Sequence, residues 1–351
     1  MERLTPLPWQ NDLWRQLVAA RERTPHALLL HGARGIGKRH FVRALAQTLL
    51  CETPDRDGLP CGQCPSCHLL AAENHPDLRW LIPEIDQPPR EEAEEPVEAA
   101  TAASKPTKAS REIRIDQVRA ISEFLTLAAH RGGRRVVVLA PAEALNGPAA
   151  NALLKVLEEP PSGAVFLAVT DELDAVLPTV RSRCVLLRSP VPQRDEALTW
   201  LRAQGVADAD DALAEAGGAP MELVLSTEDD ARRLSPELRA RLLELLAKGR
   251  RLSPAEIVAA VPKDTTLGEA IRLFQRWGWD LLAEATAARV RYYPRQQRAL
   301  AAVARDCEPQ RVLNWLGELA NAQATADHPL NARLAVEGLL MGYLDAVRPA
   351  R

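Results

Sequence analysis

The segment GARGIGKRH, which begins at Gly32, has the spacing of a phosphate-binding loop. Gly32, Gly37 and Lys38 complete the pattern Gly-x-x-x-x-Gly-Lys, with a further glycine at Gly35. In such a loop the backbone N–H groups surround the phosphates, and the lysine reaches the β- and γ-phosphates. The next residue normally offers a Ser or Thr hydroxyl to Mg²⁺, but here it is Arg39, which has only donors. A nucleotide-binding loop and a strand-to-helix turn without chemical use both remain open.

A second Mg²⁺ position should follow the apolar run from Val136 to Leu139, where a carboxylate is expected. The residues at that place are Ala140 and Pro141, and neither side chain can hold a metal ion. Glu143 is the first carboxylate beyond them. Because two independent Mg²⁺ positions are lost together, the sequence predicts a site that does not hydrolyse ATP.

Four of the six cysteines lie close together in the sequence, in the pattern Cys-x9-Cys-x2-Cys-x2-Cys. They are Cys51, Cys61, Cys64 and Cys67. Two-residue gaps allow neighbouring thiolates to converge on one ion, and four thiolates suit tetrahedral Zn²⁺. We therefore expect one structural zinc ion, with an iron–sulfur cluster and unligated thiols as the alternatives. Cys184 and Cys307 are expected to be ordinary buried thiols.

The elements around these residues alternate between strand and helix. Apolar runs predict strands over residues 26–31, 78–82, 135–139, 165–169 and 183–187, and helical periodicity predicts helices over residues 8–24, 115–127 and 149–157, with another helix directly after the glycine loop. This alternation indicates a parallel sheet with helices on both faces. We assign residues 1–188 to this α/β domain, with a zinc module at about 51–67. Residues 84–110, rich in Glu, Pro, Ala, Thr and Lys, are predicted to be a disordered insertion.

The strand pattern ends at residue 189. Residues 189–231 are predicted to form a small helical domain that contains Gly217 and Gly218, and residues 232–351 to form a third, all-helical domain. Helices are predicted over residues 195–201, 209–216, 236–247, 267–287, 296–304, 309–322 and 330–346.

Composition limits the function classes. The chain has 351 residues, 46% hydrophobic and 4% aromatic, with a formal net charge of −3. This balance argues against a protein that coats nucleic acid by bulk charge. No apolar run has the length of a membrane span or of a signal peptide, so we expect a soluble cytoplasmic protein.

Several motifs together resemble the clamp-loader branch of the AAA+ ATPases. Ser182-Arg183-Cys184 matches the family's SRC motif, and the segment from Asn151 to Pro161 matches the helix and turn before sensor 1. Thr170 stands at the sensor 1 position, and the four clustered cysteines match the clamp-loader zinc module. The resemblance covers essentially the whole chain apart from residues 84–110.

The resemblance implies a role for Arg183. In this family the SRC arginine is an arginine finger, which reaches the γ-phosphate bound by a neighbouring subunit. Such a finger supplies a fixed positive charge to the transferred phosphate and needs no nucleotide of its own. Arg181 is a less suitable substitute. The implied partners are the tau/gamma ATPase subunits and the delta subunit, and through the complex the sliding clamp and primed DNA.

The departures from the family pattern agree with one another. Catalytic subunits carry a hydroxyl after the loop lysine, acidic residues after the strand and a sensor 2 arginine, where this chain has Arg39, Ala140-Pro141 and Met221. We therefore expect a non-hydrolysing subunit whose first two domains form the AAA+ module and whose third joins a collar. It would be a part of a DNA-directed DNA polymerase holoenzyme without an ATPase of its own. Whether its loop holds ATP or ADP stays open. The alternatives are an active ATPase of tau/gamma type and a zinc-dependent nucleic-acid-binding protein.

Overall fold

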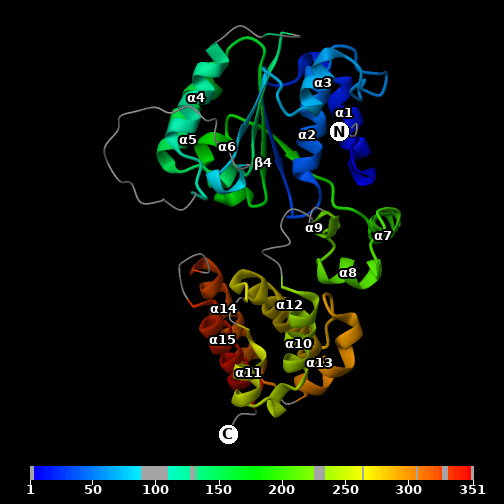
Figure 1. Cartoon of the computed structure of the whole chain (residues 1–351), viewed down its shortest axis with the longest axis vertical. Coiled ribbons are helices and arrows are strands. Elements are labelled where there is room, and N and C mark those ends of the chain that lie inside the picture. The colour runs from blue at the N-terminus through cyan, green and yellow to red at the C-terminus, as the bar shows by residue number, and fades with distance from the viewer. Residues whose placement is uncertain are drawn as a thin grey trace, which may run out of the picture. The chain divides into compact units, whose positions relative to one another are not determined.

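The chain divides into two compact units, Met1–Gln193 and Arg194–Arg351 (Figure 1). The computed structural model describes residues 4–87, 110–126, 130, 133–224, 234–262, 265–305, 307–325 and 331–348. Within these residues, all strands belong to the first unit, and the second unit is helical. The predicted order of an α/β part and a helical part is thus confirmed. The division at residues 188 and 231 stays a prediction, since residues 225–233 lie outside the described residues.

A five-stranded parallel sheet forms the centre of the first unit. Its strands are β1 (Ala27–His31), β2 (Leu78–Leu81), β3 (Arg135–Leu139), β4 (Ala164–Thr170) and β5 (Val185–Arg188), in the order β2-β3-β4-β1-β5. Every pair is parallel, and His31 at the end of β1 lies opposite Thr170 at the end of β4. The carboxyl ends of β1, β3 and β4 therefore meet at one edge of the sheet.

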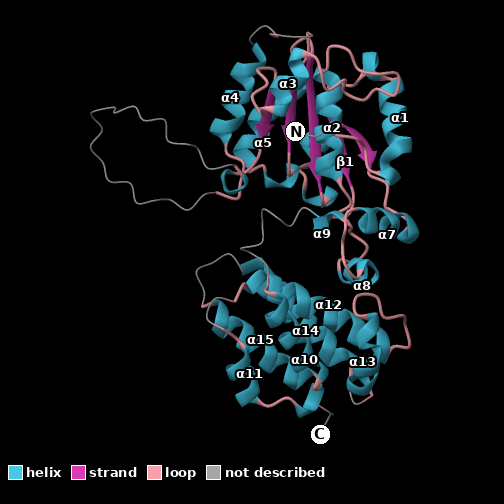
Figure 2. Cartoon of the chain, turned by 45° about the vertical axis from the view of Figure 1, so that its right-hand side comes forward, coloured by secondary structure: helices cyan, strands magenta, loops and turns pink. Residues whose placement is uncertain are grey.

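Helices cover both faces of this sheet (Figure 2). They are α1 (Asn11–Ala19), α2 (Lys38–Leu50), α3 (Pro65–Ala71), α4 (Ile115–Thr126), α5 (Gly147–Glu158) and the single-turn α6 (Pro178–Arg181). Successive strand residues point to opposite faces. Leu28 and Leu30 accordingly pack with residues of α1 and α2, whereas Ala27 and Leu29 pack with residues of α4 and α5. The three central strands β1, β3 and β4 are buried on both faces, which explains their continuous apolar runs, whereas the edge strands β2 and β5 are partly exposed.

One sequence prediction for the first unit differs from the structure, and another lies mostly outside the described residues. The helix predicted over residues 8–24 is shorter, since α1 spans Asn11–Ala19 between the 3-10 turns Pro8–Gln10 and Arg21–Arg23. Thr24 precedes a proline and is extended, which prevents continuation of the helix. Most of the predicted disordered insertion, residues 88–109, lies outside the described residues. The residues at its two ends are described and are in contact, because the Ser110 N–H donates to Glu84 Oε2 at 3.0 Å.

The second unit is built from helices around a core rich in aromatic rings. The helices are α7 (Arg194–Ala203), α8 (Ala209–Glu215), α9 (Met221–Val224), α10 (Pro236–Ala247), α11 (Pro254–Ala260), α12 (Leu267–Ala285), α13 (Gln297–Ala304), α14 (Pro309–Thr325) and α15 (Ala332–Ala346). Trp277, Trp315 and Tyr343 are fully buried in the larger core. Tyr343 links two helices, because its hydroxyl accepts from Trp277 Nε1 at 3.3 Å and donates to Leu246 O at 2.6 Å. A smaller apolar cluster joins α7 and α8.

None of the described helices is long and apolar enough to span a membrane. The cytoplasmic location stays a prediction.

A buried carboxylate fixes the connection after α12. Asp280 is 1% exposed and accepts hydrogen bonds from the backbone N–H groups of Arg291, Tyr292 and Tyr293, the shortest at 2.6 Å. A carboxylate is suited to this position because it offers only acceptors. Three backbone donors of the loop thus depend on one side chain.

Substitution Asp280→Asn should destabilise the helical unit by on the order of 2 kcal/mol. The amide turns an NH₂ group toward backbone donors and removes the negative charge that strengthens these bonds. Urea unfolding followed by circular dichroism measures the change. Asp345→Asn, at an exposed position of α15, should change stability by less than about 0.5 kcal/mol. Equal effects of the two substitutions would contradict the assignment.

Candidate functional site

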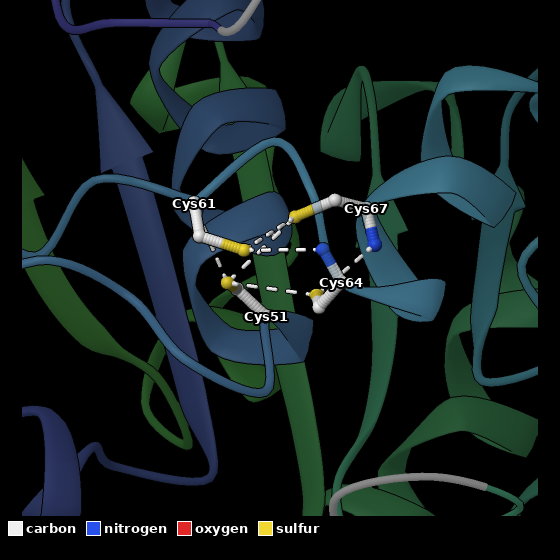
Figure 3. A group of neighbouring side chains, drawn as sticks. All are labelled: Cys51, Cys61, Cys64 and Cys67. Atoms are coloured by element: carbon white, nitrogen blue, oxygen red, sulfur yellow. Dashed lines mark hydrogen bonds between the residues drawn. The ribbon is translucent and has the colours of Figure 1, made fainter.

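The four clustered cysteines converge from the end of one helix, the following loop and the start of the next helix. Cys51 follows α2 directly, Cys61 lies in the loop, Cys64 is the N-cap of α3 and Cys67 lies in its first turn. The four Sγ atoms lie within 4.8 Å of one another (Figure 3). Gly62 has φ +74°, a backbone conformation that favours glycine and turns the chain between two of the ligands. The predicted grouping of these residues is therefore present, and they could bind a metal ion.

The sulfur positions suit a tetrahedral ion. The distances are 3.9 Å from Cys51 to Cys64, 3.9 Å from Cys61 to Cys67 and 3.7 Å from Cys67 to Cys51. Four sulfurs at about 2.3 Å from a tetrahedral centre lie about 3.8 Å apart. Backbone N–H groups also point at the sulfurs, for example from Cys64 to Cys61 Sγ at 3.3 Å and from Cys67 to Cys64 Sγ at 3.4 Å. Such donors stabilise negative charge on thiolates.

The surroundings of the clustered cysteines shift the pKa values of three thiols in different directions. Hydrogen bonds from Thr53 and from the backbone N–H groups of Gln63 and Cys64 lower the pKa of Cys61 to about 6. Burial raises the pKa of Cys67 and of Cys51. Protons therefore compete with a metal ion mainly at the two buried thiols.

A buried histidine, which the sequence analysis did not single out, braces the cysteine helix. His75 is 3% exposed, and its Nδ1 accepts from the Asp77 N–H at 3.1 Å. Its Nε2 consequently carries the hydrogen and donates to Ser66 Oγ at 3.1 Å. Ser66 is itself fully buried between two of the cysteines. The contact fixes the ligand-bearing turn of α3 to the chain segment that leads into β2.

The glycine loop lies between β1 and α2, where its pattern predicts it. Gly35 and Gly37 have φ of +73° and +93°, and Gly37 is the N-cap of α2. Two residues before α1, both missed by the sequence analysis, hold the loop. Trp9 Nε1 donates to Ile36 O at 2.9 Å, and the fully buried Gln10 donates to Gly37 O at 3.0 Å. These two hydrogen bonds fix the backbone of the loop against the segment before α1.

Lys38 is turned back into the protein. Its side chain is 2% exposed, and its Nζ donates to Gly32 O at 2.6 Å and Ala33 O at 2.5 Å. The same Nζ forms an ion pair with Asp171 Oδ1 at 2.5 Å. An ammonium group has three donors, so all three are satisfied within the chain.

The two positions expected to bind Mg²⁺ hold other groups. Arg39 directs its guanidinium to Asp86 Oδ2 at 3.4 Å and to Ala140 O at 3.5 Å, at the carboxyl end of β3. Glu143, the first carboxylate after these residues, accepts from the Asp171 N–H with its Oε1 at 3.1 Å. Buried Thr170 ends β4, and its Oγ1 accepts from the Glu172 N–H at 3.1 Å.

Arg183 and Cys184 directly precede β5 and therefore lie away from the carboxyl edge of the sheet. Arg183 lies between α6 and β5 and donates to Thr179 O at 2.9 Å and Ser182 Oγ at 3.3 Å. It also forms an ion pair with Glu158 at the end of α5. Cys184 and Cys307 are half-buried and not fully buried as predicted. Burial still raises the pKa of the Cys184 thiol to about 11, and Cys307 Sγ donates to Val303 O at 3.1 Å. Met221 begins α9 in the second unit.

Comparison with known proteins gives consistent matches. The family model described as DNA polymerase III, delta subunit matches residues 9–192, about half of the chain. The DNA polymerase III subunit delta' of Pseudomonas aeruginosa is 42% identical over 219 residues, 61% of this chain and 59% of that protein. The subunit delta' of Haemophilus influenzae is 31% identical over 262 residues, 73% of this chain and 71% of that protein. The match to the Pseudomonas protein thus spans less than two thirds of its length.

A solved structure supports the fold. The chain resembles a DNA polymerase III gamma-subunit-related protein of Thermotoga maritima with a TM-score of 0.51 at 18% identity, over 97% of this chain and 100% of the other. At this identity the likeness concerns the fold alone.

The metal-free chain should bind one equivalent of Co²⁺, used as a spectroscopic probe, with sulfur-to-cobalt charge-transfer absorption. Cys67→Ser should weaken binding at least about 10-fold, since one of four thiolates is lost. Affinity should rise as the pH is raised from about 6 to about 8, because protons leave the buried thiols on binding. Cys184→Ser is the matched control and should bind as the unaltered chain does. Saturation at a different stoichiometry, or binding insensitive to Cys67→Ser, would disprove the site.

Proposed function

Since the chain belongs to the DNA polymerase III delta-prime subunit family of clamp-loader AAA+ proteins, we propose that it acts as a non-hydrolysing subunit of a clamp loader in DNA replication. The family and the fold class predicted from the sequence are confirmed. The chain would help to load a sliding clamp onto primed DNA and would supply an arginine finger to its neighbour's ATP site.

The position of Arg39 supports the proposal that this subunit does not hydrolyse ATP. Its guanidinium lies 3.5 Å from Ala140 O, between the loop and the strand end that should hold Mg²⁺ together. A guanidinium has only donors and cannot ligate Mg²⁺, and neither Arg39 nor the Ala140-Pro141 pair supplies the hydroxyl or carboxylate expected at these positions. Phosphoryl transfer depends on Mg²⁺ to neutralise charge on the β- and γ-phosphates. The chain's own loop is therefore unsuited to hydrolysis.

Arg183 is the group that we propose to act on a neighbouring subunit. Its side chain is 33% exposed and lies on the surface with Glu158. A guanidinium in such an ion pair can exchange one anionic partner for another at small cost, since exposed pairs contribute about 0–1 kcal/mol. The γ-phosphate of ATP in the neighbour's loop would be the new partner.

We propose that the helical domain at residues 232–351 holds this subunit in the complex. We propose that residues 1–188 and 189–231 form the AAA+ module and that residues 232–351 join a collar with the tau/gamma ATPase subunits and the delta subunit. The large aromatic core of α12, α14 and α15 would give that collar domain a rigid body.

We propose zinc as the ion at the four cysteines, with a structural role. Four thiolates close the coordination sphere and leave no open position for a substrate. Elemental analysis of the chain purified without added metal should give zinc, whereas iron would support a cluster instead.

In the assembled complex, Arg183→Ala should lower ATP turnover by about 10³-fold or more, as expected for loss of an arginine finger. Assembly itself should survive, because Arg183 lies at the surface and outside the apolar cores. ATP hydrolysis and clamp loading are measured beside size-exclusion chromatography of the complex. Arg181→Ala is the control, since Arg181, at the end of α6, pairs with the exposed Asp174, and its loss should leave turnover near its normal value. Normal turnover with Arg183→Ala would refute the finger.

The alternative of an active ATPase is tested on the isolated chain. We expect no Mg²⁺-dependent ATP hydrolysis above background, and no change with Lys38→Ala, because both Mg²⁺ ligands are missing. Hydrolysis that disappears with Lys38→Ala would support the alternative. A zinc-dependent nucleic-acid-binding protein is less suited to the net charge of −3; tight, strongly salt-dependent DNA binding by the chain alone would favour it.

A further inference from the structure

The lysine of the glycine loop already holds an anion that belongs to the chain itself. Lys38 Nζ contacts Asp171 Oδ1 at 2.5 Å, and its two remaining donors are taken by Gly32 O and Ala33 O. A phosphate that entered the loop would need one of these three donors. The most obvious exchange is with the carboxylate, because a phosphate oxygen and a carboxylate oxygen accept in the same way.

The fold delivers Asp171 to this place. Asp171 follows Thr170, whose Cα pairs with that of His31 directly before the glycine loop. The turn after β4 is fixed from two sides, by Glu143 Oε1 on the Asp171 N–H and by Thr170 Oγ1 on the Glu172 N–H, each at 3.1 Å. The carboxylate therefore stands beside the lysine without a flexible linker between them.

The second cation of the loop is also neutralised. Arg39 pairs with Asp86 at 3.4 Å. Lys38 and Arg39, the two positive side chains at the start of α2, thus each contact a carboxylate.

We propose that Asp171 is an internal occupant of the phosphate loop, which blocks the binding of nucleotide phosphates by holding Lys38. The Asp171 side chain is 39% exposed while that of Lys38 is 2% exposed. The carboxylate covers the lysine from the solvent side, the direction from which a phosphate would arrive. An ion pair holds Lys38, so removal of the Asp171 charge should make the lysine available to a phosphate.

The test uses the full chain and Asp171→Asn, which keeps the side-chain shape and removes the charge. Binding of inorganic pyrophosphate and of ADP, without Mg²⁺, is measured by isothermal titration calorimetry. We expect affinity at least about 10-fold higher for Asp171→Asn than for the unaltered chain. The gain should vanish in the double variant with Lys38→Ala. Asp174→Asn, which removes an exposed carboxylate three residues further on, should bind as weakly as the unaltered chain.

Three outcomes would overturn the proposal: equal affinity of the unaltered chain and Asp171→Asn, no binding by a folded Asp171→Asn chain, or a gain that persists without Lys38. Loss of its counter-ion leaves Lys38 buried and unpaired, which is destabilising. The melting temperature of Asp171→Asn is therefore also recorded with and without pyrophosphate. The proposal requires that pyrophosphate raises it more than that of Asp174→Asn, and an equal rise contradicts it. None of these measurements involves Arg183 or a partner, so their outcome is independent of the proposed clamp-loader role.

Discussion

The parallel pairing of β4 with β1 is the constraint on which the site depends. This pairing places His31 opposite Thr170, so that the glycine loop and the turn after β4 leave the sheet side by side. β3 pairs with β4 on its other side and ends there at Leu139, so Ala140 joins the same edge. In open α/β sheets ligands bind at the carboxyl ends of the strands. The chain keeps this geometry although the residues at the edge have changed.

The changed residues leave a balanced set of charges. In an ATP site of this fold, the positive loop lysine binds the phosphates, and side-chain oxygens bind Mg²⁺. Here Lys38 is matched by Asp171 and Arg39 by Asp86. Both cations thus have carboxylate partners within the chain, and Trp9 and Gln10 brace the loop through its backbone carbonyl groups.

The sequence predicts the local patterns well and the long-range pairs poorly. Continuous apolar runs identify β1, β3 and β4 because strands buried on both faces need them, and shorter apolar stretches identify the edge strands β2 and β5. The close cysteine spacing identifies the thiolate cluster. Helix α11 was missed, although Ser253 and Glu256 form a capping box at its start, a signal that the sequence contains. The pairs Lys38–Asp171 and Arg183–Glu158 could not be predicted, since many acidic residues were available and only the fold selects one. His75 carries no local signal either, because its role depends on a contact with Ser66 in another element.

Burial distinguishes the two intramolecular ion pairs and accounts for their different proposed roles. The Lys38 side chain is 2% exposed, so its charge has lost most of its hydration and depends on Asp171 and two carbonyl groups. Asp171 itself is 39% exposed, but breaking the pair leaves the buried Lys38 charge without its carboxylate, which is destabilising. The Arg183 side chain is 33% exposed and its partner Glu158 49%, so water can replace either partner. A subunit that keeps its own loop closed while it offers a cation to another needs this asymmetry: the pair in the loop must be hard to break, and the pair at the surface must be easy to exchange.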